Sequence, residues 1–193
     1  PTGSNPQLDK IPQQIGKYKI MKKIGSGAYS QVFAAFDFDS GSQVCIKIVS
    51  KSTIHTEIDT IQFAREIKTL SSISHPNIIR FIEFIEDENN YYIAQELCNG
   101  ASLIQFLTAA EKPLSERLGR IIFYQLIEVL IFLHQNGIYH RDIKLENILI
   151  NKDMTIKVID FGFCAFGNQD SLLNTICGSL HYLPPECIRG EAY

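Results

Sequence analysis

The densest group of polar side chains is the run YHRDIKLEN at residues 139–147, which lies between two apolar stretches. Three of its side chains could do chemistry together. Asp142 could accept a proton from a hydroxyl group, Lys144 could neutralise a phosphoryl group in transfer, and Asn147 could bind a hard cation through its carboxamide oxygen. A run of this kind would be unusual in a loop that only connects two elements.

Two further segments suit phosphate chemistry. Asp160, in the tripeptide Asp160-Phe161-Gly162, ends an apolar strand, where a carboxylate suits a magnesium ligand, although the tripeptide alone is more simply a strand-terminating turn. The run GSGAYSQV at residues 25–32 lies between two expected strands, and its glycines let backbone N–H groups approach phosphate oxygens. A plain glycine-rich hairpin explains this run equally well. A Rossmann or Walker A loop is disfavoured, because no helix follows.

Lys47 lies at the end of the apolar sequence Val44-Cys45-Ile46 in an expected strand. An unpaired charge inside a protein is costly, so a buried lysine needs an anionic partner. Glu66, close to the apolar stripe of the helix that follows, is the candidate partner. The alternative is a lysine at the edge of the sheet whose amine reaches water.

The hydrophobic pattern predicts the elements that position these side chains. Strands are expected over residues 18–24, 31–38, 43–49, 78–86 and 91–97, and an amphipathic helix over residues 58–73. Beyond residue 100 we expect helices over 102–110 and 115–135 and short strands over 148–150 and 156–159. A β-rich half followed by a helical half predicts two lobes that join near residues 96–100, and clefts between lobes are common ligand sites.

The helix over residues 115–135 is apolar nearly all round and is therefore expected to be buried on most sides. Its most apolar part, residues 121–133, is interrupted by Gln125 and Glu128. No segment reaches the roughly 18 to 20 apolar residues of a membrane span, so we expect no membrane partner.

Composition excludes several other classes of protein. The chain has 193 residues, 45% hydrophobic and 20% charged, with a net charge of −3, which is typical of a globular protein. It has no block of like charge, so we expect no nucleic-acid partner. Its five cysteines form no CxxC pair, which argues against a disulfide framework or a zinc ribbon and favours a cytoplasmic setting. Residues 1–17 are expected to be a flexible leader or linker, without the pattern of a signal peptide.

Taken in chain order, the glycine-rich hairpin, the strand lysine, the helix glutamate, HRDIKLEN, DFG and Pro184-Pro185-Glu186 follow the protein-kinase signature set. From residue 18 onward the chain therefore resembles the eukaryotic protein kinase family. The resemblance implies an α+β, bilobal fold. Its ATP-binding N-lobe, residues 18–97, would be a five-stranded antiparallel sheet with one helix, and residues 98–193 would form a partial, helical C-lobe.

The resemblance also implies the cofactors and the site residues. ATP and Mg²⁺ are expected, with Asp142 orienting and deprotonating the substrate hydroxyl. The implied catalytic residues are Asp142, Lys144, Lys47 and Glu66, and the implied metal ligands are Asn147 and Asp160. The implied ATP-binding residues are Gly25, Ser26, Gly27, Val32, Cys45, Lys47, Gln95, Glu96, Cys98 and Leu149.

Substrate type and regulation follow from the same resemblance. Lys144, two residues after Asp142, resembles serine/threonine kinases, so protein substrates with Ser or Thr are expected. Thr175 matches the activation-loop phosphosite, a target for an upstream kinase, and Arg141 is the expected partner of its phosphate. Leu70, Phe81, His140 and Phe161 match the stacked apolar column of active kinases. The glycine-rich loop and the segment 175–182 look most like the calcium/calmodulin-dependent and AMP-activated kinase group.

Several positions depart from the family pattern. Ser30 replaces the third glycine, Cys45 an alanine above the adenine, Pro184 the alanine of Ala-Pro-Glu, and Ser102 an acid found in relatives that prefer basic substrates. The resemblance also implies a C-terminally incomplete domain, because the chain stops at Tyr193, before the central helix of the C-lobe.

Without that central helix, residues 115–135 are expected to lose their main packing partner, and the exposed apolar area favours aggregation or oligomerisation. Two functions stay open. One is a serine/threonine kinase that transfers the γ-phosphoryl group of ATP. The other is a kinase-like nucleotide-binding or regulatory fragment without transfer activity.

Overall fold

The computed structural model describes residues 11–27, 30–110, 113–167 and 179–190. The chain divides into two compact units, which are treated separately below. The first unit comprises residues 1–53 and 83–97, and the second comprises residues 54–82 and 98–193. The segment 54–82, which the sequence placed in the N-lobe, is thus grouped with the second unit.

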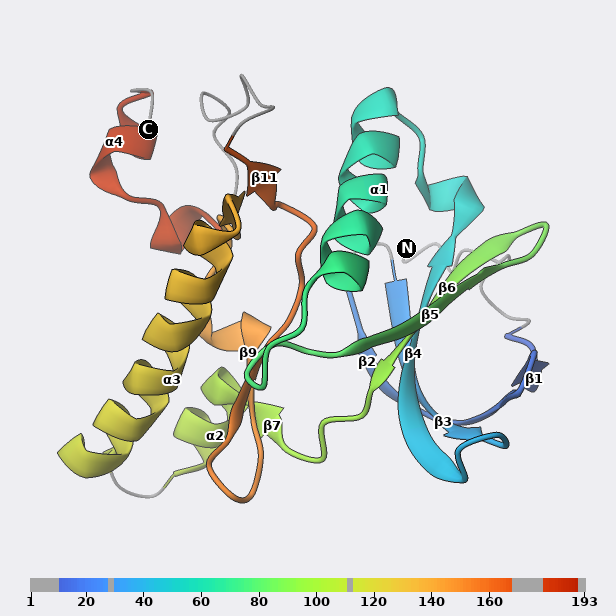
Figure 1. The fold of residues 1–193 in the computed structure, drawn as a ribbon, viewed down its shortest axis with the longest axis horizontal. Coiled ribbons are helices and arrows are strands. Elements are labelled where there is room, and N and C mark those ends of the chain that lie inside the picture. Colours follow the sequence, from blue (N-terminus) through green and yellow to red (C-terminus); the bar gives the residue numbers. More distant parts are fainter. Residues whose placement is uncertain (1–10, 28–29, 111–112, 168–178, 191–193) are drawn as a thin grey trace, which may run out of the picture. The chain divides into compact units, whose positions relative to one another are not determined.

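A six-stranded sheet in the order β1-β2-β3-β4-β6-β5 forms the first unit, except that the first two residues of β5 are grouped with the second unit (Figure 1). Its strands are β1 (Gln14–Ile15), β2 (Tyr18–Ser26), β3 (Ser30–Asp37), β4 (Ser42–Ser50), β5 (Phe81–Glu86) and β6 (Asn90–Glu96), and a 3₁₀ turn at Lys51–Thr53 follows β4. The five expected strands are confirmed, although β5 begins three residues later than residue 78, where the sequence placed its start. The end of the expected leader adds the sixth strand, because Ile15 is buried and pairs with Tyr18.

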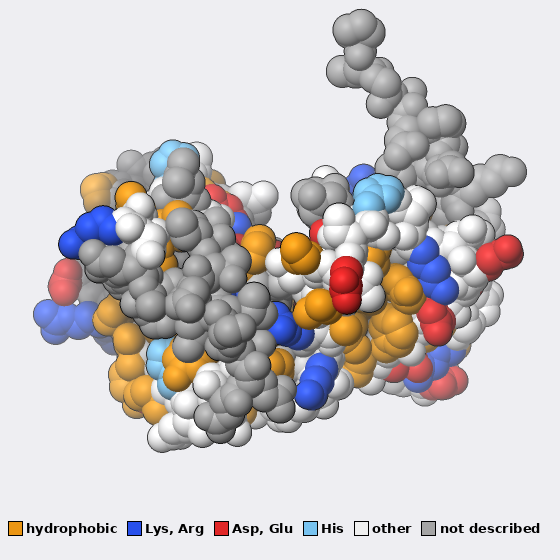
Figure 2. All heavy atoms as spheres, turned by 90° about the horizontal axis from the view of Figure 1, so that it is seen from above, with side chains coloured by type: hydrophobic (Ala, Val, Ile, Leu, Met, Phe, Trp, Pro, Cys, Tyr) orange, Lys and Arg blue, Asp and Glu red, His pale blue; other side chains and the backbone are white. Residues whose placement is uncertain are grey.

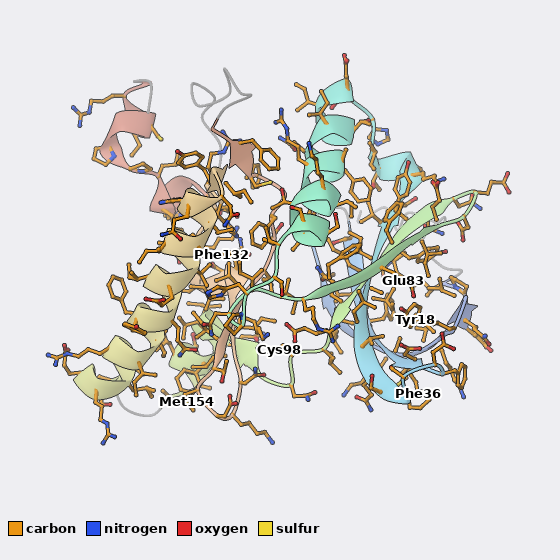
Figure 3. The ribbon with its side chains drawn as sticks, in the orientation of Figure 1. Tyr18, Phe36, Glu83, Cys98, Phe132 and Met154 are labelled. Carbon is orange, nitrogen blue, oxygen red and sulfur yellow. The ribbon has the colours of Figure 1, made fainter. Side chains whose placement is uncertain are left out.

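Contacts between β2 and β5 curl this sheet, since these strands lie near opposite ends of the strand order. The hydroxyl of Tyr18 donates a hydrogen bond to the carboxylate of Glu83, and the two side chains point toward each other (Figure 3). Lys17 places its ammonium 3.2 Å from the same carboxylate. Burial raises the pKa of the Tyr18 phenol, and the hydrogen bond to Glu83 raises it further.

The second unit contains four helices and two small sheets among its described residues. The helices are α1 (Glu57–Ser72), α2 (Leu103–Ala109), α3 (Glu116–Gln135) and α4 (Pro185–Ile188), with 3₁₀ turns at Leu145–Asn147 and Leu180–Tyr182. The strands are β7 (Ala101–Ser102), β8 (Ile138–Tyr139), β9 (Ile148–Ile150), β10 (Ile156–Val158) and β11 (Ala165–Phe166), in sheets ordered β10-β9-β7 and β11-β8.

Helix α3 packs into the second unit along one face only. Ile122, Val129 and Leu133 are buried in two apolar clusters that also contain residues of β9 and β10. On other faces Phe123 and Tyr124 are 62% and 67% exposed, so the expectation of burial on most sides was wrong. Among the described helices, α3 is long and apolar enough to span a bilayer by length and composition alone, a criterion that the core helix of a globular protein also meets.

Candidate active site

In the first unit, four of the expected ATP-binding residues share one face of the sheet. Val32 of β3 lies opposite Lys47 of β4, and Cys45 of β4 lies opposite Gln95 of β6. Residues opposite each other, and alternate residues of one strand, project to the same face. Val32, Cys45 and Lys47 are half-buried there, and Gln95 is buried.

The opposite face of β4 explains why this face stays partly open. Val44, Ile46 and Ile48 alternate with the site residues and are buried in the core of the first unit. The period-2 pattern of the strand therefore forces Lys47 away from the core. Lys47 and Glu66 belong to different units, and their pairing stays a prediction.

The glycine-rich hairpin connects β2 with β3. Gly25 pairs with Val32, Ser26 pairs with Gln31, and the N–H of Gly27 donates to the carbonyl of Ser30 at 2.9 Å. Residues 28 and 29 at its tip lie outside the described residues. Gly25 and Gly27 keep the backbone of the hairpin free of bulky side chains, which a phosphate ligand requires.

Glu96, Cys98 and Leu149 are three further residues that are expected to bind ATP. Glu96 ends β6 in the first unit, and Cys98 begins the next part of the second unit. The thiol of Cys98 donates a hydrogen bond to Asn151 Oδ1 at 3.0 Å. Leu149 is half-buried on β9, opposite Ser102 of β7.

Asp142 is the centre of a dense hydrogen-bonding cluster in the second unit. Its side chain is 1% exposed, and Oδ2 lies 2.7 Å from Lys144 Nζ and 2.9 Å from Asn147 Nδ2. Its Oδ1 accepts from both the N–H and the hydroxyl of Ser179, each at 3.0 Å. Lys144 also donates to the hydroxyl of Ser179 at 2.7 Å, so the cluster is closed on itself.

The electrostatics of this cluster keep Asp142 ionised. Burial alone would raise the pKa of its carboxyl group, but the hydrogen bonds from Lys144 and Ser179 outweigh burial and hold the pKa below the ordinary value. An ionised carboxylate held by several donors is rigid and can orient a substrate hydroxyl.

Ser179 is a part of this cluster that the sequence interpretation missed. It lies 37 residues from Asp142, in the segment 175–182 that the sequence assigns no role in the catalytic site. Its sequence signal is weak, because a serine after a glycine is common in any loop. Thr175 and Cys177 lie outside the described residues.

Asn147 and Asp160 fit a magnesium site of the type that keeps most of its ligands from phosphate and water. The Nδ2 of Asn147 is committed to Asp142, and no donor in the described part of the chain contacts its Oδ1, which is left for a cation. Asp160 is half-buried, and from the described residues its side chain accepts only a long hydrogen bond, at 3.4 Å, from the N–H of Gly162. Among the described residues no three His, Cys, Asp or Glu side chains cluster, so a cage made of protein ligands alone is absent there.

Two backbone positions of the site are strained. Arg141 and Asp160 have φ angles of 63° and 64°, in the left-handed region that side chains other than glycine rarely adopt. Such strain costs on the order of 1–2 kcal/mol and is typically found at functional sites. Arg141, the expected phosphate partner, donates from Nε to the carbonyl of Phe163 at 2.7 Å.

The expected apolar column assembles in the second unit. Leu70 and Phe161 are fully buried in one cluster, and Phe81 packs against it. The rings of His140 and Phe161 are 4.7 Å apart between centroids. His140 accepts from the N–H of Asp142 at Nδ1 and contacts the carbonyl of Ile159 through Nε2, and burial lowers its pKa, so it is neutral.

Glu66 is presented by α1, whose start is fixed by a reciprocal capping box between Thr56 and Asp59. The Glu66 side chain is buried beside the Asp160-Phe161-Gly162 turn, since a Cβ placed on Gly162 would lie 3.9 Å from Glu66 Oε2. The second unit thus holds Asp142, Lys144 and Asn147 in one cluster, and Glu66 lies beside the turn that begins with Asp160.

Comparison with known proteins identifies the family of the chain. The family model for the protein kinase domain matches residues 18–193, so the chain belongs to the protein kinase family. The fold expected from the sequence is therefore confirmed at the level of the family.

The similar curated proteins are serine/threonine kinases by name. The chain is 38% identical over 183 residues to CBL-interacting serine/threonine-protein kinase 17 of Arabidopsis thaliana. This alignment covers 93% of this chain and 42% of the relative. It is 36% identical over 177 residues to NUAK family SNF1-like kinase 1 of Mus musculus, covering 92% of this chain and 27% of the relative. The chain therefore spans less than half the length of these relatives.

Proposed function

We propose that this chain carries the ATP-binding and catalytic residues of a serine/threonine protein kinase. The observation that carries the proposal is the closed cluster of Asp142, Lys144, Asn147 and Ser179. It holds a carboxylate, an ammonium and a carboxamide in one rigid arrangement, as phosphoryl transfer by positioning requires. The names of the relatives favour Ser and Thr of protein substrates as acceptors.

The residues of the cluster have separate tasks in the transfer. The substrate hydroxyl would displace one of the four donors that now hold the Asp142 carboxylate, and Asp142 would then accept its hydrogen bond and take its proton. The hydroxyl oxygen forms a bond to the γ-phosphorus of ATP, while the bond from that phosphorus to the β–γ bridging oxygen breaks and ADP leaves. Lys144 neutralises charge on the phosphoryl group in transfer.

The remaining site residues bind the nucleotide. Asn147 and Asp160 would hold Mg²⁺, which when bound neutralises charge on the phosphates. The half-open face with Val32, Cys45 and Lys47 would contact the nucleotide from the first unit. An upstream kinase acting on Thr175 is the regulation that we propose, with Arg141 as the phosphate partner.

The test is transfer of phosphate from labelled ATP to a Ser/Thr-containing peptide. Asp142→Asn should lower the rate about 100-fold or more, because the base is lost while the shape is kept. Asp153→Asn, at an exposed aspartate in the turn between β9 and β10, is the matched control and should transfer at the parent rate. Equal rates for the parent chain and Asp142→Asn would refute the kinase proposal, and nucleotide binding without transfer would support the regulatory alternative.

A further inference from the structure

Gln125 is a carboxamide in the apolar middle of α3, and all its hydrogen-bonding groups are used. Its Oε1 accepts from Asn77 Nδ2 at 2.8 Å and from the N–H of Ile156 at 3.0 Å. Its Nε2 donates to the carbonyl of Met154 at 2.9 Å and to that of Ile121 at 3.2 Å. Met154 lies in the turn between β9 and β10 (Figure 3), so Gln125 holds the start of β10 from the side of α3.

Asn77 extends this attachment along β10. Its Nδ2 also donates to the carbonyl of Ile156 at 3.1 Å, and its own carbonyl accepts from the N–H of Val158 at 2.8 Å. The N–H of Ile79 donates to the carbonyl of Val158 at 3.0 Å, and Ile78 forms a parallel bridge with Val158. The segment 77–79 therefore runs beside β10 like a short extra strand. Gln125 is hydrogen-bonded to Asn77, the first residue of this segment.

Strand β10 leads directly to the expected metal ligands. Asp160 follows its last residue, Val158, by two positions, and the N–H of Ile159 donates to the carbonyl of Asn147 at 2.9 Å. A shift of β10 along its axis would therefore move Asp160 relative to Asn147. Gln125 cannot itself touch a nucleotide bound there, because Asp160 lies four residue steps beyond Ile156, about 13 Å at about 3.3 Å per residue.

We propose that Gln125 is a positioning residue for the metal site. Through Asn77 and β10, it fixes the separation between Asp160 and Asn147 that binding of Mg²⁺–nucleotide requires. The inference rests on the proposed function, in which these two side chains hold Mg²⁺. The simpler alternative is that Gln125 only satisfies buried backbone groups and so contributes to stability alone.

Magnesium-dependent nucleotide binding distinguishes a positioning role of Gln125 from a role in stability alone. The whole chain is titrated with MgCl₂ at a fixed concentration of a fluorescent ATP analogue, and binding in EDTA is measured separately. Gln125→Leu should raise the Mg²⁺ midpoint about tenfold or more, the usual effect of losing support behind a metal ligand, and leave binding in EDTA nearly unchanged. Asn77→Leu should do the same, and the double variant should lose no more than either single one, because both act through one attachment.

Val129→Ala is the matched stability control, because Val129 is buried one turn further along α3 and has no side-chain hydrogen bond to lose. It should lower Tm and leave the Mg²⁺ midpoint at the parent value. If Gln125→Leu does not fold, Gln125→Glu keeps an oxygen that accepts from Asn77 and Ile156, and a smaller rise of the midpoint is expected. The inference is wrong if Gln125→Leu keeps the parent midpoint or if Val129→Ala shifts it equally. If the parent chain itself shows no magnesium-dependent binding, the proposed function fails instead.

Discussion

At the scale of single residues, the candidate site depends on side chains that support Asp142 as much as on Asp142 itself. Ser179 occupies both hydrogen-bonding directions of one carboxylate oxygen, while Lys144 and Asn147 occupy the other. A hydroxyl with this role is invisible in the sequence, because its partner is 37 residues away.

Ser179→Ala should lower the transfer rate about 10- to 100-fold, because Asp142 loses one donor and Lys144 loses one acceptor, so that both side chains are less well placed. Ser179→Thr keeps the hydroxyl and should keep most of the rate. Initial rates at saturating ATP check both, with urea unfolding to show that stability is retained. Full activity in the alanine variant would mean that the serine is dispensable.

His75 should make the stability of the second unit depend on pH. Burial lowers its pKa below the ordinary value of 6.5, Glu128 opposes this shift and Lys157 reinforces it. Its Nδ1 accepts from the N–H of Asn77 at 3.1 Å, and its ring packs on Phe132, with 5.0 Å between ring centroids. Protonation therefore costs the folded state an acceptor and a buried contact.

The direction in which stability changes with pH follows from the lowered pKa of His75. Between the folded-state pKa and 6.5 the unfolded chain binds more protons, so stability is complete above pH 6.5 and is lost as the pH falls through this window. Urea unfolding between pH 7.5 and 5 should show this loss. The slope should be shallower in His75→Gln than in the parent chain, while the buried His140, whose pKa is also lowered, contributes a slope of the same sign to both. An unchanged slope in the variant would contradict the role of His75.

At the scale of elements, hydrophobic periodicity predicted the main strands and helices, because each long element buries one face. It missed β1, which has only two residues, too few to show a period. It also predicted that α3 is buried on most sides, which is wrong. A hydrophobic pattern shows which residues are apolar but not how many neighbouring elements cover them. Gln125 looked like an interruption, because its partners come from a distant turn and strand.

Gly100 should be the least replaceable of the glycines that the structure describes in the second unit. A Cβ at this position would lie 1.7 Å from the carbonyl oxygen of Ile150, which is backbone and cannot rotate away. Gly100→Ala should therefore destabilise the chain by about 3 kcal/mol or more through overpacking.

Gly119→Ala is the control for this substitution. Its Cβ would make only an ordinary 3.7 Å contact with Leu114, and alanine favours the helix by up to about 1 kcal/mol. Urea unfolding of both variants provides the comparison. Similar stabilities for the two would show that the segment at Gly100 adjusts without cost.

At the scale of the whole molecule, exposed apolar side chains on α3 predict self-association of residues 1–193 when they are expressed as they stand. Ile121, Phe123, Tyr124 and Ile131 are each more than 40% exposed on this one helix. Hydrophobic side chains also reach the surface elsewhere, interspersed with charged ones (Figure 2). Scattered apolar residues are ordinary, whereas several on one helix favour association.

Phe123→Glu combined with Tyr124→Lys should shift the chain toward monomer, because two large apolar contacts are replaced by charges. Light scattering across a range of concentrations measures this. Phe38→Glu, at a residue of the first unit that is 55% exposed, is the control and should leave association unchanged. If the double variant on α3 associates as strongly as the parent chain, α3 is not the surface responsible for association.

The closure of the curled sheet by Tyr18 and Glu83 has a consequence for biosynthesis. These residues are 65 positions apart, and the first unit is built from two separate pieces of chain with the segment 54–82 between them. Its sheet therefore cannot be completed on the ribosome until β6, ending at Glu96, has left the exit tunnel. Since long-range pairing is slow and leaves strand edges open meanwhile, we expect the nascent β2–β4 meander to be the stage most prone to aggregation.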